Sequence, residues 1–288
     1  MIFISQLSAR IANRLGLLKV FRIGYLFKIL NSVFKIPVIE NNEGFLYHRT
    51  ISEPFILHLY NQLYDSTDFI FLDVGVNFGQ TLLKIKAVNS AASYIGFEPS
   101  GLCSYYTSHL IKINKFTDAQ IIRCALADKP GVLTLFGHSE GDTVASIVAS
   151  SMLQQEFASK EYVPVVTLDS LIPIITSTGK EMLLKVDVEG AEWMVFQGGE
   201  AFINQFRPVI VFENLPAGND EAKQHEQQYI SNFLSEKNYA LYLLDETHAR
   251  LSAITNIDNK VNQNTTNFLA VPSEKIYMFP QILKEVAI

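Results

Sequence analysis

FIFLDVGVNFG, residues 69–79, followed by SYIGFE, residues 93–98, is the most informative part of this chain. The apolar run at its start predicts a strand that is buried on both faces, and residues 80–88 have a helical pattern. Between strand and helix lies a D-x-G-x-N-x-G turn, whose named residues are Asp73, Gly75, Asn77 and Gly79. A strand, a glycine turn, a helix and a second strand in this order predict the nucleotide-binding start of an α/β sheet.

The residues of this turn indicate which cofactor to expect. A dinucleotide site would carry G-x-G-x-x-G, because a pyrophosphate binds at the helix N-terminus, and the glycine spacing here is different. Asp73, at the tip of the first strand, suits a cofactor with a cationic amino-acid group. Glu98, at the end of the second strand, can accept hydrogen bonds from both hydroxyls of a ribose. We therefore expect S-adenosylmethionine as the cofactor. The alternative is an oxidoreductase with a degenerate NAD-binding turn, and Asp73 argues against it.

Composition narrows the class of protein. The 288 residues are 48% apolar, which is enough for a large core in one large domain or two modest ones. The net charge of −6 argues against nucleic acid as a partner. Two cysteines imply no disulfide framework, and no signal peptide or membrane-spanning run is recognisable. These features predict a cytoplasmic protein.

Residues 1–37 differ from the rest of the chain in charge. They contain six basic residues and no acid, a local charge of +6, and because the whole chain carries −6 the remainder carries −12. Apolar residues recur every three or four positions from Leu7 to Val33, which predicts amphipathic helices that end before Pro37. We interpret this segment as a helical extension that packs on the main domain or on a second subunit. Peripheral contact with the inner face of an anionic membrane is the alternative.

Strands and helices alternate after this extension. We expect residues 1–60 to form the helical extension with its linker and residues 61–288 to form the cofactor-binding domain. Buried strands are predicted at residues 69–72, 93–98, 119–126, 182–186 and 209–212, with further strands at 132–136, 163–168, 239–244 and 267–271. Helices are predicted at 80–88, 101–113, 191–206 and 222–236. The alternation predicts a mainly parallel sheet with helices on both faces.

A second constellation lies in LLKVDVEGAE, residues 183–192. Lys185, Asp187 and Glu189 fall at alternate positions where a buried strand runs out, and Glu213 ends another strand at the same predicted edge. Such carboxylates could orient a polyhydroxylated substrate, act as a base or hold a divalent cation. An ion pair between Lys185 and Asp187, with no further role, is the structural alternative.

Several blocks of the chain resemble the FkbM family of S-adenosylmethionine-dependent methyltransferases. The matching pieces are FLDVGVNFG (71–79), GFEPS (96–100), RCALADKPGVLTLF (123–136), VVTLDSL (165–171), LLKVDVEGAEWMVFQGG (183–199), RPVIVFEN (207–214) and NFLAVP (267–272). The resemblance implies a Rossmann-like class I methyltransferase fold, usually with seven strands of which the last is antiparallel. It also implies methylation of a hydroxyl on a sugar, a polyketide or a related small metabolite.

On this hypothesis the cofactor is held by eight residues, which are Asp73, Gly75, Asn77, Gly79, Glu98, Pro99, Ala125 and Leu126. The catalytic candidates are Asp187, Glu189 and Glu213, with His138 as a weaker one. No metal ligands are assigned, and a divalent cation is the less favoured version of the chemistry. A non-catalytic S-adenosylmethionine-binding protein or membrane-associated scaffold is the rival from another functional class.

Overall fold

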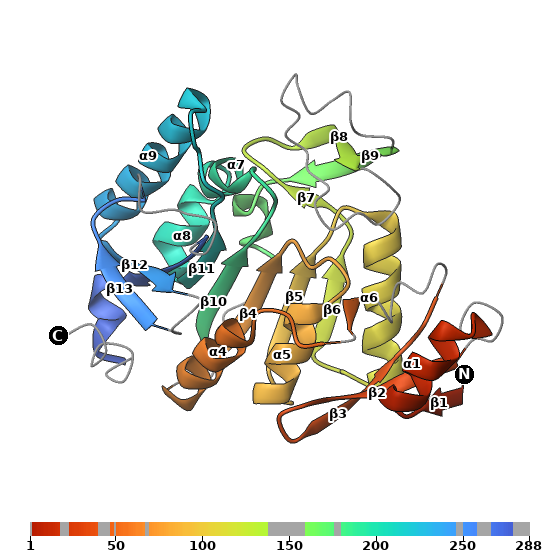
Figure 1. The fold of residues 1–288 in the computed structure, drawn as a ribbon. Coiled ribbons are helices and arrows are strands. Elements are labelled where there is room, and N and C mark those ends of the chain that lie inside the picture. Colours follow the sequence, from red (N-terminus) through yellow and green to blue (C-terminus); the bar gives the residue numbers. More distant parts are fainter. Residues whose placement is uncertain are drawn as a thin grey trace.

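An eight-stranded sheet forms the centre of the molecule in the computed structural model (Figure 1). The structure describes residues 2–17, 23–39, 47–48, 50–66, 69–137, 159–175, 180–245, 250–257 and 266–278. The strand order across the sheet is β13 (Arg250–Ile254), β12 (Tyr239–Asp245), β14 (Asn267–Pro272), β11 (Val209–Glu213), β10 (Glu181–Val186), β4 (Phe69–Val74), β5 (Ser93–Phe97) and β6 (Ala119–Ile122). The run from β11 to β6 is parallel, so the carboxyl ends of these strands lie along one edge.

Helices cover both faces of this sheet. Those on one face are α4 (Pro54–Ser66), α5 (Gln80–Val88) and α6 (Gly101–Asn114), and those on the other are α7 (Glu192–Gln197), α8 (Glu200–Phe206) and α9 (Glu221–Glu236). Strand β4 shows why two layers form, because its side chains alternate between two hydrophobic clusters. Phe69 and Phe71 pack with the first group of helices, whereas Ile70 and Leu72 pack with the second. The α/β architecture with helices on both faces is thus as predicted.

The sheet has one strand more than the seven that were predicted. Its continuous parallel part has five strands, and β14, the last strand along the chain, lies antiparallel between β11 and β12, as the resemblance implied. The extra strand is β13, which pairs antiparallel with β12. Its sequence, RLSAI, is short and only partly apolar, so nothing in its local pattern distinguishes it from a loop. The sheet is therefore mixed and eight-stranded among the described residues.

The single strand predicted at residues 119–126 is two strands in two sheets. β6 stays in the central sheet, whereas β7 (Ala125–Leu126) pairs with β9 (Ser159–Val166), which in turn pairs with β8 (Gly131–Gly137). Figure 1 shows this small sheet beyond the carboxyl ends of the central strands. The apolar pattern runs through the break at Arg123 and Cys124, so periodicity alone does not reveal the change of sheet.

The single helix predicted at residues 191–206 is likewise interrupted, by Gly198 and Gly199 between α7 and α8. A Cβ at Gly198 would lie 2.0 Å from the carbonyl oxygen of Ala127. The backbone of the helix pair therefore touches the segment that follows β7, a close approach that only glycine permits.

The N-terminal segment is only partly helical, which corrects the predicted helical extension. It consists of β1 (Ile2–Ile4), α1 (Gln6–Arg14), β2 (Ile23–Ile29) and β3 (Ser32–Ile36), and the three strands form a separate sheet. Tyr25 and Ile29 are four residues apart, a spacing that fits one face of a strand as well as one face of a helix. Phe27, between them, is also buried while Leu26 and Lys28 are exposed, and this period of two identifies the strand.

This segment is joined firmly to the central sheet. Tyr25, Phe27 and other side chains of β2 and β3 belong to the same hydrophobic cluster as α5 and α6. Asn114 of α6 bonds to both the backbone N–H and the carbonyl of Lys35, and the hydroxyl of Tyr106 donates to the carbonyl of Pro37. The boundary at residue 60 stays a prediction. In the described part of the chain, no helix has both the length and the apolar character needed to cross a bilayer.

Candidate active site

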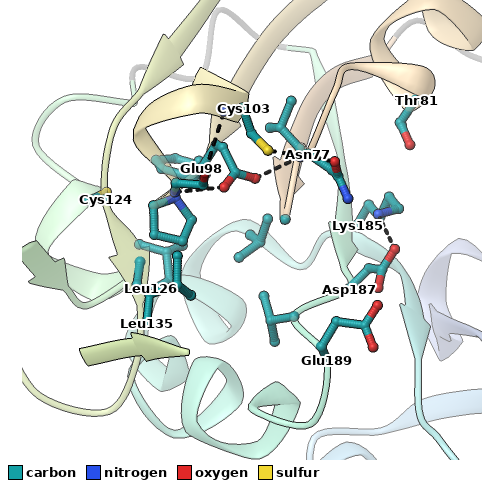
Figure 2. A pocket seen from close by; sticks show the side chains of 18 of the residues that line it. Asn77, Thr81, Glu98, Cys103, Cys124, Leu126, Leu135, Lys185, Asp187 and Glu189 are labelled. Carbon is teal, nitrogen blue, oxygen red and sulfur yellow. Dashed lines mark hydrogen bonds and ion pairs between the residues drawn. The ribbon is translucent and has the colours of Figure 1, made fainter. Parts of the chain in front are cut away.

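A pocket opens at the carboxyl ends of β4, β5 and β10 (Figure 2). Its lining comes from the ends of these strands and the turns after them, the first turns of α5 and α6, β7 with the residue before it, β8, and one residue of the segment before α4. The lining residues are Glu53, Val74, Gly75, Val76, Asn77, Gln80, Thr81, Phe97, Glu98, Pro99, Ser100, Cys103, Cys124, Ala125, Leu126, Leu135, Lys185, Asp187, Val188 and Glu189. This is the sheet edge at which the sequence predicted a site.

The glycine turn after β4 brings the turns after β4 and β10 into contact. Gly75 has φ +90°, and a Cβ there would lie 1.8 Å from the carbonyl oxygen of Asp187. The N–H of Gly75 donates to Phe97, and the N–H of Asp187 donates to Val74. Gly75 therefore satisfies two demands that no other residue meets together, a left-handed backbone and a close approach of two main chains. As a result, Asp187 lies beside the turn of β4.

Glu98 is a buried carboxylate on this pocket, with 6% of its surface exposed. One oxygen accepts the N–H of Asn77 at 2.7 Å and the other accepts the N–H of Ser100 at 2.8 Å. Burial raises the pKa of Glu98 to about 7, although these two hydrogen bonds oppose the rise. Because each carboxylate oxygen has a second lone pair, Glu98 can still accept hydrogen bonds from two hydroxyls of a ligand.

The two sides of the pocket differ in polarity. Figure 2 shows Cys124, Leu126 and Leu135 together on one side, while Asp187 and Glu189 lie on the other. Glu98 can accept hydrogen bonds from two hydroxyls of a ligand, and the apolar wall beside it suits a flat aromatic base. The acidic side of the pocket suits cationic or hydroxylated groups. The pocket therefore has a nucleoside-like end and an acidic end.

Lys185 connects Asp187 to the buried Asp73. The Nζ of Lys185 lies 2.8 Å from Asp187 and 3.6 Å from Asp73, and the Lys185 side chain is 6% exposed. Burial lowers the pKa of Lys185, but the two carboxylates raise it more, so the pKa lies well above its usual value. Burial would raise the pKa of Asp187, but Lys185 holds it below the ordinary value. The ion pair proposed as the structural alternative is thus present, and its carboxylate also faces the pocket.

Glu213 extends this group of acids. One carboxylate oxygen from each of Asp187, Glu189 and Glu213 lies within 4.8 Å of the others. The pKa of Glu213 rises to about 8, because the group is largely buried and because the charge of Asp187 disfavours its ionisation. Glu213 also shares a hydrogen bond with Asp187 and accepts the hydroxyl of Thr266 at 2.9 Å. Near neutral pH the proton of this pair therefore resides on Glu213 while Asp187 is ionised.

The structure brings most of the predicted site residues together. Gly75, Asn77, Glu98, Pro99, Ala125, Leu126, Asp187 and Glu189 all line the pocket. Glu213 lies close to Asp187 but is not part of the lining. His138 lies outside the described residues.

Two predicted cofactor residues are placed differently from the expectation. The side chain of Asp73 is fully buried and is absent from the pocket lining. It accepts a hydrogen bond from the hydroxyl of Tyr94 and faces Lys185. Gly79 begins α5 in a left-handed conformation and packs against Thr107 and Leu110 of α6. Both residues therefore support the pocket from beneath its lining, and neither is part of the lining.

Other lining residues were missed by sequence analysis. Glu53, from the segment before α4, lines the pocket and pairs with the buried Lys84 of α5 at 2.8 Å. Leu135 comes from β8, and Cys103 from the first turn of α6. Glu53 lies outside every matching block, so only the folded chain identifies it. Leu135 lies within the block at 123–136, but no feature of that block distinguishes it as a lining residue. Gln80 and Thr81 could have been found, because they follow the glycine turn directly.

Glu192 is a buried acid just outside the lining, with 2% of its surface exposed. One of its oxygens accepts the N–H groups of Val188 and Gly190, at 3.3 and 3.0 Å, and so holds the turn that carries Glu189. Burial raises the pKa of Glu192 to about 7 from an ordinary 4.5. A glutamate with a raised pKa favours folding while it is protonated, and this contribution is lost as the pH rises through about 7.

Glu192→Gln should therefore flatten the pH dependence of stability. As the pH rises from 5 to 8, the free energy of unfolding of the wild type should fall by about 1–3 kcal/mol more than that of the variant. Urea unfolding at several pH values measures this difference, and other titrating groups cancel because both proteins contain them. Parallel stability curves for the two proteins would contradict the prediction.

Comparison with known proteins adds an independent finding. The family model of the methyltransferase FkbM domain matches residues 73–241 of this chain. No curated protein matches it. Similar solved structures include a methyltransferase FkbM from Methylobacillus flagellatus KT, with 13% identity, a TM-score of 0.46, and coverage of 78% of this chain and 52% of that one. The chain thus spans about half the length of that structure.

Two further structures resemble the chain at a similar level. One is a caffeoyl-CoA O-methyltransferase candidate from Staphylococcus aureus, with 8% identity, a TM-score of 0.45, and coverage of 82% of this chain and 86% of that one. The other is an rRNA methylase from Streptococcus thermophilus, with 11% identity, a TM-score of 0.41, and coverage of 74% and 93%. Because all three TM-scores are below 0.5, only the family match carries weight.

Proposed function

The chain belongs to the methyltransferase FkbM domain family, and we propose that it transfers a methyl group from S-adenosylmethionine to a hydroxyl of a small molecule such as a sugar or polyketide. The observation that carries this proposal is the two-ended pocket. Glu98 and the apolar wall lie at one end, and the carboxylates of Asp187 and Glu189 lie at the other. A nucleoside cofactor and a hydroxylated acceptor can meet between them.

The lining fits S-adenosylmethionine in its chemistry. Glu98 is a buried acceptor with free lone pairs for two ribose hydroxyls, and Cys124, Ala125, Leu126 and Leu135 offer an apolar wall for the adenine. Glu53 adds negative charge for the cationic amino-acid group. In this arrangement Asp73 acts indirectly, by pairing with Lys185 of the pocket lining. When bound, the cofactor supplies an electrophilic methyl group.

Asp187 is the proposed general base. It is ionised because Lys185 and Glu213 lower its pKa, and about a quarter of its side chain, 26%, is exposed to the pocket. An acceptor hydroxyl that donates to Asp187 would be oriented before reaction and would pass its proton to this carboxylate as its oxygen becomes nucleophilic. Glu189, from the same turn, is proposed to orient neighbouring hydroxyls of the acceptor.

Lys185 bears on the alternative in which the acids bind a divalent cation. The ammonium group lies 2.8 Å from Asp187 and already neutralises part of the acidic group. Since a cation at these carboxylates would have to compete with Lys185, we favour the base role over the ligand role. Methyl transfer should therefore persist in the presence of EDTA.

Release of S-adenosylhomocysteine, measured with a panel of sugars and phenolic polyols, tests the proposed function. The rate should rise as the pH increases through about 8, because Glu213 then loses its proton. Asp187 is ionised on both sides of this pH, but above it Asp187 no longer accepts the hydrogen bond from Glu213 and has a second negative charge beside it, which makes it the stronger base. Glu213→Gln should remove this dependence while leaving cofactor binding intact. Tight cofactor binding without turnover on any hydroxylated acceptor would instead favour a non-catalytic binding protein.

A further inference from the structure

Helix α1 is packed with its small residues inward and its large apolar residues outward. Ala9 and Ala12 are buried, with 0% and 9% of their surface exposed. Leu7, Ile11 and Leu15 are 70%, 54% and 66% exposed. An amphipathic helix of a globular protein ordinarily buries its large apolar side chains. In α1 these side chains remain available for a partner.

The exposed side chains form one stripe with a basic border. Leu7 and Ile11 of α1, and Leu15 at its C-cap, are spaced by four residues and therefore lie one above the other on the helix surface. Arg10 and Arg14 are exposed, and the helical repeat of 100° per residue places both next to this stripe on one side. Residues 1–37 contain no acid, whereas the rest of the chain carries −12. A stripe of this kind is complementary to an apolar layer beneath a negatively charged surface.

The helix is presented by a rigid support. It connects β1 to β2, and its N-cap, Ser5, accepts the N–H of Ser8. The N-terminal sheet is tied in turn to α6 through Asn114 and Tyr106. Because the helix is already folded, docking would not have to order it, which reduces the entropic cost of binding.

We propose that α1 docks the protein on an anionic lipid bilayer, with Leu7, Ile11 and Leu15 in the acyl boundary and Arg10 and Arg14 at the lipid phosphates. A second copy of the chain is a poorer occupant of this surface. A nine-residue helix offers much less than the roughly 800 Å² per partner of a stable interface. A two-fold axis would also bring the basic borders of the two copies together. The proposal does not depend on the enzymatic activity.

Flotation of the full chain with lipid vesicles tests this surface. Vesicles of phosphatidylcholine with about one third phosphatidylglycerol should bind the protein at least tenfold more tightly than pure phosphatidylcholine. A variant with Leu7→Ser, Ile11→Ser and Leu15→Ser should lose at least tenfold in binding to the anionic vesicles. Arg10→Gln with Arg14→Gln should also weaken binding and reduce its sensitivity to salt.

Val132→Ser with Ile174→Ser is the matched control, because these side chains are 66% and 69% exposed and lie outside α1. This variant should bind vesicles like the wild type, and all variants should keep the wild-type melting temperature. The proposal would be overturned if the folded wild type did not float with anionic vesicles, or if the triple variant floated equally well. Sedimentation that reveals a dimer abolished by the triple variant would also overturn it, in favour of a second copy.

Discussion

Asp187→Asn should lower the turnover number for methyl transfer by about 10²–10⁴-fold, the usual contribution of a general base. Asparagine keeps the size of the side chain but cannot take the proton of the acceptor hydroxyl. S-adenosylmethionine should still bind within a few-fold of the wild type, because Glu98 and the apolar wall are untouched. Calorimetric titration with S-adenosylmethionine measures the effect on cofactor binding. The steady-state rate of S-adenosylhomocysteine release measures the effect on turnover.

The control for this variant is Glu189→Gln. Glu189 lines the same pocket and comes from the same turn, and it is assigned only to the orientation of the acceptor. Its loss should raise the KM of the acceptor more than it lowers turnover. The melting temperature of Asp187→Asn must also be measured, because the substitution removes the closer of the two carboxylates that pair with the buried Lys185 and could destabilise the fold. Equal turnover losses in both variants would contradict the assignment of Asp187 as the base.

Glu98→Ala should weaken binding of S-adenosylmethionine by about a hundredfold or more. Two hydrogen bonds from ribose hydroxyls to a buried carboxylate are lost, each worth about 1.5–3 kcal/mol. The affinity of the wild type should also increase as the pH rises through about 7, because ionised Glu98 is the better acceptor. Calorimetric titration at several pH values measures both effects.

Glu98 also holds two backbone N–H groups, from Asn77 and Ser100, so its removal could disturb the pocket itself. A 2′-deoxy analogue of S-adenosylhomocysteine distinguishes the two causes. The wild type should bind this analogue less tightly than the parent compound, whereas Glu98→Ala should bind the two with equal affinity. If the variant still discriminated between them, Glu98 would not be the group that recognises the ribose.

The order of strands and helices in the central domain could be predicted from the sequence because each signal is local. Apolar runs at residues 69–72 and 182–186 predict strands buried on both faces, and Gly75 predicts a tight turn. The position of Glu98 and Asp187 at the sheet edge follows as well, since parallel strands end along the same edge. Local patterns were insufficient for β13, for the break between β6 and β7, and for the period of β2.

The α/β class of the protein, the resemblance to its family and the acids at the strand ends could all be recognised from local sequence patterns. The tertiary structure alone decided that Asp73 lies beneath the pocket, that Glu53 and Leu135 join its lining, and that α1 turns its leucines outward. The physical reason is that periodicity along a chain records which side chains share a face. Which face is covered, and by which distant segment, depends on contacts that form only when the whole chain packs.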